Sequence, residues 1–110
     1  MRVLFVCSRN LLRSPTAEVV FARYEGLETS SAGTAPDAAT PVSADLIDWA
    51  DVIFAMENRH RDKLREMFGK PLRTKRLIVL GIPDDYDYMD SELVEILRRK
   101  VSPFLPVPDP

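Results

Sequence analysis

A chain of 110 residues is long enough for one domain with a single core and too short for two. Its 45% hydrophobic and 29% charged residues are typical of a globular protein. The net charge of −2, with lysines and arginines scattered among acids, argues against nucleic acid as a partner. The single cysteine excludes an internal disulfide and suits a reducing compartment, so we expect a cytoplasmic protein. The N-terminus lacks the apolar stretch of a signal peptide, and no apolar run is long enough for a membrane span.

Short apolar runs alternate with amphipathic stretches along the chain. Strands are expected over residues 2–6, 27–31, 52–55 and 75–80. Helices are expected from about Ser14 to Gly26, over 44–49 after a Ser43 cap, from Asn58 to Gly69, and from an Asp90 cap to Val101. Because strands and helices alternate, the sequence predicts an α/β fold with a parallel sheet.

The helix from Asn58, two loops and the C-terminal tail have distinct expected features. The helix that begins at Asn58 is expected to direct four side chains inward, namely His60, Leu64, Met67 and Phe68, so the only histidine is interpreted as structural. Residues 35–41 and 81–89 are expected to be loops, the second rich in acids and tyrosines. The C-terminal residues carry four prolines and are expected to form an irregular tail.

Residues 3–18 contain the main functional signal. An apolar strand is followed directly by Cys7, and a short loop then leads to Arg13 and to a helix start at Ser14. Such a loop directs backbone N–H groups and a helix N-terminus toward one centre, which suits a phosphate. Cys7 is therefore predicted to be a nucleophile held as a thiolate, and Arg13 is predicted to bind two phosphoryl oxygens through its planar guanidinium. The alternatives are an inert core cysteine and a surface arginine paired with Glu18.

The pattern Cys7-x5-Arg13-Ser14-Pro15-x-Ala17-Glu18 behind a strand resembles the low-molecular-weight protein tyrosine phosphatase family. Residues 31–34, 50–56 and 83–86 agree with it in order, so the resemblance covers most of the chain. It implies a single three-layer α/β domain over residues 1–102, with a Pro-rich tail over 103–110. Its four-stranded parallel sheet would have the order 2-1-3-4, with helices on both faces and the phosphate-binding loop after strand 1. It also implies a hydrolase that forms a phosphocysteine and needs no metal or other cofactor.

The resemblance implies a general acid in the loop after the fourth strand. Asp84 is the candidate, protonating the leaving oxygen and later activating water. The family pattern is Asp-Pro-aromatic, and Asp85 stands here in place of the proline, so both acids remain candidates. Either can equally be a solvated loop residue. Tyr86 aligns with the family's aromatic residue and is expected to form a wall beside the substrate.

The phosphate loop is expected to bind substrate through Ser8, Arg9, Asn10, Leu11, Leu12 and Ser14, with Asp85 and Tyr86 contributing from the acidic loop. The resemblance implies that Ser14 donates to the cysteine sulfur and that Asn10 fixes the loop in a left-handed backbone. Arg9 replaces a glycine of the family, so its side chain must point outward or accept strain. Leu12 replaces a second cysteine of many relatives, so oxidation by peroxide is expected to be less reversible.

Two further departures bear on specificity. In related phosphatases a small hydroxyl residue at the position of Leu11 goes with phosphoarginine, so leucine favours an aromatic phosphomonoester. Relatives also carry a longer segment, with an extra helix, between the second and third strands. The histidine that supports the catalytic loop in some of them has no counterpart here. The pocket rim is therefore expected to be lower on that side, and specificity looser.

Protein tyrosine phosphatase is thus the leading hypothesis, with a phosphorylated protein or an aryl phosphate as partner and the chain a monomer or weak dimer. The alternatives are a phosphatase for small aryl or nucleotide phosphomonoesters, a non-catalytic phosphoprotein-binding module and a phosphoryl carrier. Nucleophile, arginine and acid together argue against the module, and an acid able to activate water argues against the carrier. Arsenate reductases that resolve through internal disulfides need further cysteines, which this chain lacks.

Overall fold

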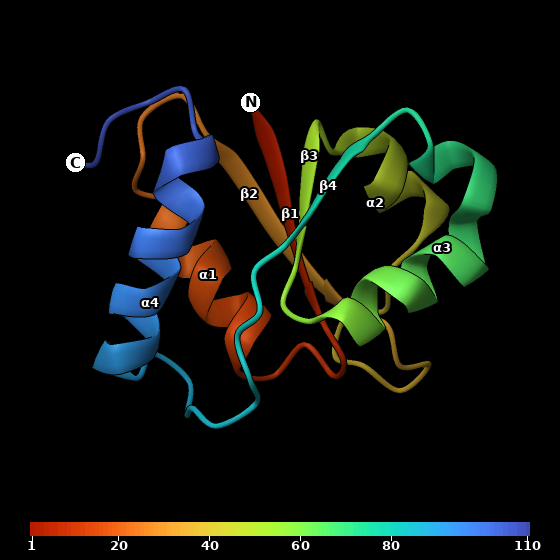
Figure 1. Ribbon diagram of the computed structural model, residues 1–110, viewed down its shortest axis with the longest axis horizontal. Coiled ribbons are helices and arrows are strands. Elements are labelled where there is room, and N and C mark those ends of the chain that lie inside the picture. The colour runs from red at the N-terminus through yellow and green to blue at the C-terminus, as the bar shows by residue number, and fades with distance from the viewer.

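The computed structural model describes residues 1–110 as a four-stranded parallel sheet with helices on both faces (Figure 1). The strands are β1 (Arg2–Cys7), β2 (Glu28–Gly33), β3 (Val52–Ala55) and β4 (Arg76–Val79). The helices are α1 (Arg13–Phe21), α2 (Ala44–Trp49), α3 (Asn58–Leu72) and α4 (Ser91–Val101), followed by the 3-10 turn η1 (Ser102–Phe104). The strand order β2-β1-β3-β4 confirms the predicted fold class and sheet topology. None of the helices combines the length and apolar character needed to cross a membrane.

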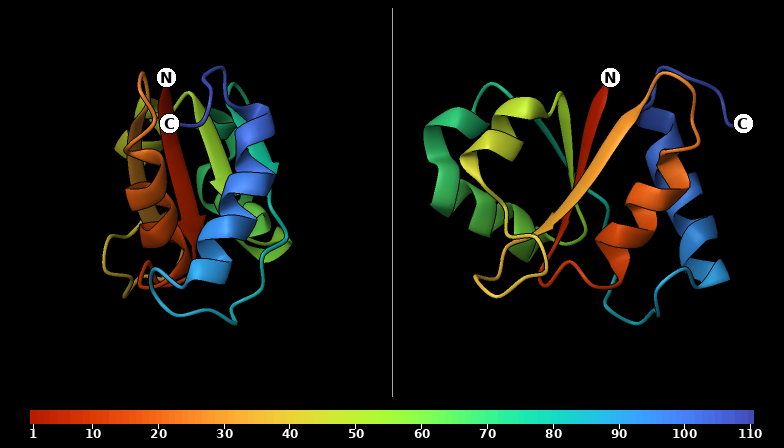
Figure 2. Two further views of the ribbon diagram at one scale, coloured as in Figure 1. Left: turned by 90° about the vertical axis from the view of Figure 1, so that its left-hand side faces the viewer. Right: turned by 180° about the vertical axis from the view of Figure 1, so that it is seen from behind.

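The central strand β1 explains the three layers. Val3, Phe5 and Cys7 point into the core that α1 and α4 cover, whereas Leu4 and Val6 point into the core under α2 and α3. Both faces of β1 are therefore buried, which is why its sequence reads as a continuous apolar run. Figure 2 shows the two helix pairs on opposite sides of the sheet.

Because all four strands are parallel, their carboxyl ends lie at one edge of the sheet. The loops that follow β1 and β4 meet at this edge, at the end of the molecule remote from both termini (Figure 1). An open α/β sheet binds ligands at this edge, so the fold brings the predicted functional loops together.

The boundaries of α1 and β2 differ from those predicted. Helix α1 starts at Arg13, so Ser14 lies inside its first turn and does not cap it, and the helix ends at Phe21. Gly26, with φ of 86°, ends the turn that follows the helix. Strand β2 begins and ends later than expected because it pairs with β1 along the whole length of that strand, from Arg2 to Cys7.

Helix α3 does not end at Gly69 as predicted. Phe68 leaves helical geometry, with φ of −131° and ψ of 28°, and one more turn continues to Leu72. Pro71 is tolerated because it lies in the first turn after this kink, where its missing N–H has no partner to lose. Met67 is 43% exposed, so the prediction that it faces the core is wrong.

The C-terminal tail is more ordered than predicted. Ser102–Phe104 forms the 3-10 turn η1, and the Phe104 ring packs edge-on at 6.1 Å from that of Phe54. The guanidinium of Arg76 lies 5.5 Å from the centre of the Phe104 ring, within the range of a cation–π contact. Val107 also packs against the core, so the tail covers part of the α4 face of the sheet.

Phe5 lies at the centre of the larger core, with its ring 5.5 Å from those of Phe21 and Phe54. Phe5→Ala is expected to lower the free energy of unfolding by about 3–5 kcal/mol, because it leaves a cavity in a close-packed interior. The control, Met67→Ala on the exposed side of α3, is expected to change it by less than about 0.5 kcal/mol. Urea unfolding followed by circular dichroism measures both variants, and equal losses would contradict this assignment of buried and exposed faces.

Candidate active site

The loop between β1 and α1 forms a pocket of about 230 Å³ at the carboxyl edge of the sheet. Its lining residues are Cys7, Ser8, Arg9, Leu11, Leu12, Arg13, Arg59 and Asp84. Cys7 and Arg13 from this loop and Asp84, which is remote from them in the sequence, therefore face one cavity. Asp85 and Tyr86 do not line it: Asp85 is exposed, and Tyr86 is half-buried against the core. The apolar surface of the pocket comes instead from Leu11 and Leu12.

A hydrogen-bond network fixes the sulfur of Cys7. Its Sγ lies 2.9 Å from Oγ of Ser14, and both residues are buried. Asn10, in the left-handed region with φ of 59°, donates from Nδ2 to Oγ of Ser14 and to Oγ of Ser31, each at 2.9 Å. Because Ser14 accepts from this amide, its own proton is left to donate, and its two acceptors are the sulfur at 2.9 Å and the Ala32 carbonyl at 3.4 Å. This arrangement stabilises a thiolate, which can only accept.

The residues after β2 support the loop from behind. Three backbone N–H groups donate to loop carbonyls at 2.9–3.0 Å, from Thr34 to Cys7, from Ala35 to Ser8 and from Ala39 to Arg9. A Cβ on Gly33 would collide with the Ser8 carbonyl oxygen and with Ala38, so only glycine allows this approach. Thr34 and the first part of the loop predicted over 35–41 thus hold the phosphate loop in place.

Arg9 points away from the pocket floor. Its Nη2 lies 3.0 Å from Oδ2 of Asp37, and both side chains are exposed. Asn10 and Met89 are the only non-glycine residues with positive φ, so Arg9 adopts an ordinary backbone conformation. The loop therefore accepts an arginine in place of the family's glycine without backbone strain.

Arg13 is buried, with a side-chain exposure of 2%. Its Nη1 donates to Oε2 of Glu57 at 2.8 Å and to the Ile82 carbonyl at 2.7 Å, and its Nε lies 3.6 Å from Oδ1 of Asp84. The alternative pairing with Glu18 does not form, because Glu18 accepts instead from Ser31. These contacts leave Nη2 of Arg13 without a protein acceptor, so it is available to an anion in the pocket.

Glu57 and Arg59 belong to this site although the sequence analysis did not single them out. Arg59 lines the pocket and donates to Oε2 of Glu57 from Nε at 3.0 Å and from Nη2 at 2.8 Å. Burial alone would raise the pKa of Glu57, but the hydrogen bonds and charges of Arg13 and Arg59 outweigh it and lower that pKa. Glu57 is the N-cap of α3 and Arg59 lies in its first turn, just after β3, and this position at the carboxyl edge of the sheet is the signal that could have revealed them.

His60, interpreted from the sequence as structural, supports the phosphate loop from the first turn of α3. Its ring is 1% exposed, with Nε2 at 2.8 Å from Oγ of Ser8 and Nδ1 accepting from the Glu57 N–H at 3.0 Å. Burial, followed by the positive charges of Arg13 and Arg59, lowers the pKa of His60 to about 4. The ring is therefore neutral near pH 7.

The loop that carries Asp84 is anchored at both ends. The Ile82 N–H donates to the Met56 carbonyl at 2.9 Å, and the Met89 N–H donates to Oγ1 of Thr16 at 2.9 Å. The side chain of Asp84 is 58% exposed. A carboxyl group at the mouth of the pocket, open to water, is placed to exchange protons with solvent and with a bound substrate.

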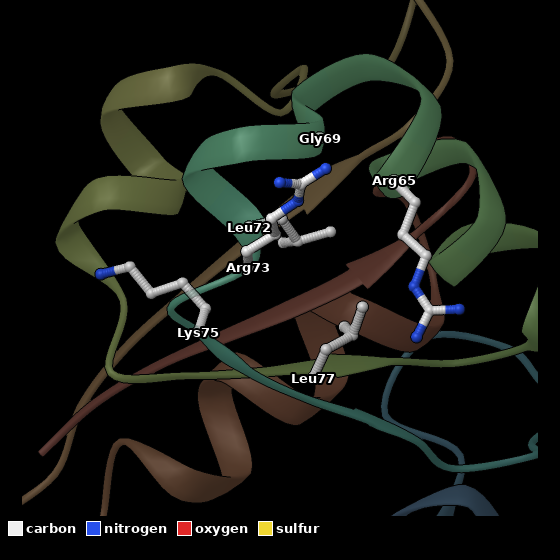
Figure 3. Close-up of a pocket in the computed structure, with 6 residues that line it drawn as sticks. All are labelled: Arg65, Gly69, Leu72, Arg73, Lys75 and Leu77. Carbon is white, nitrogen blue, oxygen red and sulfur yellow. The ribbon is translucent and has the colours of Figure 1, made fainter.

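The largest cavity, about 470 Å³, lies elsewhere, between the C-terminal part of α3 and β4. Figure 3 shows its six lining residues, namely Arg65, Gly69, Leu72, Arg73, Lys75 and Leu77. They include no cysteine, serine, histidine or carboxylate, and the amine of Lys75 donates to the Asp48 and Ala50 carbonyls, each at 2.8 Å. No group of three or more His, Cys, Asp or Glu side chains is placed to hold a metal ion.

Comparison with known proteins identifies relatives along nearly the whole chain, although no family model matches the sequence. The protein-arginine-phosphatase of Bacillus subtilis (strain 168) is 30% identical over 140 aligned positions, which cover 90% of this chain and 93% of the relative. The low-molecular-weight protein tyrosine phosphatase SP-PTP of Streptococcus pyogenes superposes with a TM-score of 0.76 at 19% identity, covering 94% of this chain and 90% of that one. A YwlE arginine phosphatase mutant with a phosphorylated active-site serine superposes with a TM-score of 0.71 at 24% identity, covering 94% and 95%.

The chain therefore belongs to the low-molecular-weight protein tyrosine phosphatase family, a family of cysteine-dependent phosphatases that includes arginine phosphatases. The 140 aligned positions exceed the 110 residues of this chain, so at least 30 of them have no counterpart here. This difference agrees with the shortening expected from the sequence.

His60 is the only histidine, so its ionisation can be followed alone. Between pH 6.5 and about 4 the unfolded chain binds a proton that the folded ring does not bind, so stability must fall as the pH falls. The loss should reach about 1.4 kcal/mol per pH unit, measured against His60→Gln as a variant that cannot titrate. Glu57, whose pKa is lowered from 4.5, adds a loss of stability of the same sign in the acid part of this window, from about pH 5 downward.

An NMR titration of the His60 ring measures its pKa directly, and urea unfolding at several pH values measures the stability difference. A ring that titrates near its ordinary pKa of 6.5, or stability curves that stay parallel for the two proteins, would contradict the buried neutral histidine.

Proposed function

We propose that this protein is a protein tyrosine phosphatase that acts through a phosphocysteine formed on Cys7. The observation that carries the proposal is that Cys7, Arg13 and Asp84 line one pocket, with a hydroxyl 2.9 Å from the sulfur. Its substrate is a phosphorylated protein in a reducing compartment such as the cytoplasm, where a lone thiol persists.

In the first step the Cys7 thiolate attacks phosphorus and the bond to the leaving oxygen breaks. Asp84, as the neutral acid, gives its proton to that oxygen, so the leaving group departs as a neutral phenol. Nη2 of Arg13 and the backbone N–H groups of the loop stabilise the charge on the transferring phosphoryl oxygens.

In the second step the Asp84 carboxylate takes a proton from water, and the resulting nucleophile attacks phosphorus. The phosphorus–sulfur bond breaks, inorganic phosphate leaves, and the electron pair returns to the sulfur as a thiolate. The Ser14 hydroxyl, 2.9 Å away, donates to that sulfur and makes it a better leaving group. The YwlE arginine phosphatase mutant with a phosphorylated active-site serine supports a covalent phosphoenzyme by analogy.

The walls of the pocket favour an aromatic monoester. Leu11, 55% exposed on the loop, and Leu12 offer an apolar surface for a ring. The guanidinium of Arg59 lies on the pocket lining, where it can stack on the ring face. A phenyl ring gains from both contacts, whereas the guanidinium of phosphoarginine meets a like charge at Arg59.

Phosphoarginine is the second candidate substrate, because the Bacillus subtilis relative at 30% identity is a protein-arginine-phosphatase. The exposed carboxylate of Asp84 at the pocket mouth is a possible partner for a substrate guanidinium. Leu11 argues against it, since a small hydroxyl residue occupies this position in the phosphoarginine enzymes that the chain resembles.

A panel of phosphotyrosine, phosphoserine and phosphoarginine peptides, with free nucleotides, tests the substrate class. We expect phosphotyrosine to give the highest kcat/KM, and Leu11→Thr to shift the ratio toward phosphoarginine. Cys7→Ser is expected to abolish turnover while still binding phosphate, because the amide-lined loop is unchanged. Turnover that survives Cys7→Ser refutes the covalent mechanism, and a preference of the wild type for phosphoarginine replaces the substrate assignment.

Asp84→Asn and Asp85→Asn form a matched pair, because only Asp84 lines the pocket. Asp84→Asn is expected to lower kcat by about 100- to 10,000-fold for phenyl phosphate and by much less for p-nitrophenyl phosphate, whose leaving group needs little protonation. Asp85→Asn should stay close to the wild type with both substrates. An equal loss of kcat with the two substrates would show that Asp84 acts by orienting Arg13 and does not protonate the leaving group. A larger loss in Asp85→Asn than in Asp84→Asn would move the acid role to Asp85.

A further inference from the structure

Ser8 follows the proposed nucleophile and is in contact with a buried histidine. Ser8 lines the pocket, and its Oγ lies 2.8 Å from Nε2 of His60. The other ring nitrogen, Nδ1, is 3.0 Å from the backbone N–H of Glu57, the residue that caps α3. His60 thus lies between the phosphate loop and the residue that holds Arg13.

The capping contact fixes the proton on the imidazole. A backbone N–H can only donate, so Nδ1 of His60 must be the unprotonated nitrogen. A neutral ring then carries its proton on Nε2 and donates it to Oγ of Ser8. Because Ser8 uses a lone pair to accept this bond, its own hydroxyl proton has to find a different acceptor.

We propose that His60 is a positioning residue that holds the Ser8 hydroxyl as an acceptor, so that the Ser8 proton is donated into the pocket to a phosphoryl oxygen. Ser8 then binds the phosphoryl group through its side chain, in addition to the amides of the loop. The inference rests on the proposed function in placing the phosphoryl group of the substrate in this pocket.

The same histidine couples two parts of the site. The backbone N–H of Glu57 donates to His60, and its carboxylate accepts from Arg13. One helix N-terminus therefore orients both the hydroxyl of Ser8 and the guanidinium of Arg13. A merely structural histidine at this position would cap α3 and fill space. It would not require one particular tautomer or affect the affinity of the pocket for phosphate.

The first test needs no variant. The nitrogen chemical shifts of the single histidine, measured by NMR near pH 7, distinguish its two tautomers. We expect the proton on Nε2. A proton on Nδ1 would overturn the proposal, because Ser8 would then donate to His60 and turn its proton away from the pocket.

The second test measures the affinity for inorganic phosphate by calorimetry. Ser8→Ala is expected to bind phosphate about 10- to 100-fold more weakly, the range for a hydrogen bond to a charged group. Ser8→Thr keeps the hydroxyl and should restore most of the affinity. Unchanged affinity in Ser8→Ala would overturn the proposal.

A pair of variants separates orientation from helix capping. Gln and Glu both serve as capping residues at the position of His60, but only Gln can also donate to Ser8. His60→Glu is expected to weaken phosphate binding about as much as Ser8→Ala, and His60→Gln much less. Introduced into Ser8→Ala, His60→Glu should cause no further loss, because its effect passes through the hydroxyl. A full additional loss would point to charge repulsion and overturn the proposal.

Turnover of an aryl phosphate by the wild type tests the proposed function separately. Weaker phosphate binding in Ser8→Ala without wild-type turnover would uphold the role of His60 and overturn the phosphatase assignment. Wild-type turnover together with unchanged phosphate affinity in Ser8→Ala would uphold the phosphatase assignment and overturn the role of His60. A wild-type protein that binds no phosphate would overturn both.

Discussion

The buried guanidinium of Arg13 is the constraint on which the candidate site depends. A charge that is 2% exposed is stable only if hydrogen-bond acceptors surround it, and these come from separate loops. Glu57 follows β3, while Ile82 and Asp84 follow β4. Arg13 therefore ties the loops after three strands into one unit at the carboxyl edge of the sheet. The fold needs this arrangement to bury Arg13, and the same arrangement places an acid across the pocket from the cysteine.

Hydrogen-bond polarity is a second common feature, visible in two serines on the phosphate loop. Ser14 accepts from the amide of Asn10, and Ser8 accepts from the imidazole of His60 in the tautomer inferred above. Each hydroxyl then has one proton left to give: that of Ser14 has the sulfur as its nearer acceptor, ahead of the Ala32 carbonyl, and that of Ser8 is proposed to point into the cavity. Residues outside the pocket thus decide the direction in which the pocket donates. A site built in this way favours anions throughout, whether the anion is a thiolate or a phosphoryl group.

The sequence predicts the fold because its local signals agree with one another. An apolar run for β1, a Cys-to-Arg loop and alternating strands and helices all indicate one parallel sheet, and the carboxyl edge then brings Asp84 to Cys7. Glu57 and His60 were not predicted as site residues, because their roles depend on how the first turn of α3 faces the loop after β1. That orientation follows from packing between elements and leaves no periodic trace in the sequence. Met67 was also misplaced: helical spacing puts it on the face of His60 and Leu64, but it is 43% exposed and not part of the core there.

The segment between β2 and β3, which the sequence predicts to be shorter than in relatives, supports the phosphate loop directly. Support here comes from the backbone of residues 34–39, whose N–H groups reach the loop carbonyls directly because Gly33 and its alanine neighbours leave room. On the opposite side His60 reaches Ser8 from α3. Backbone contacts and one buried imidazole lose little conformational entropy on folding compared with the ordering of a long additional segment. The phosphate loop therefore has its support within this short segment and α3, and the lower pocket rim expected from the sequence stays a prediction.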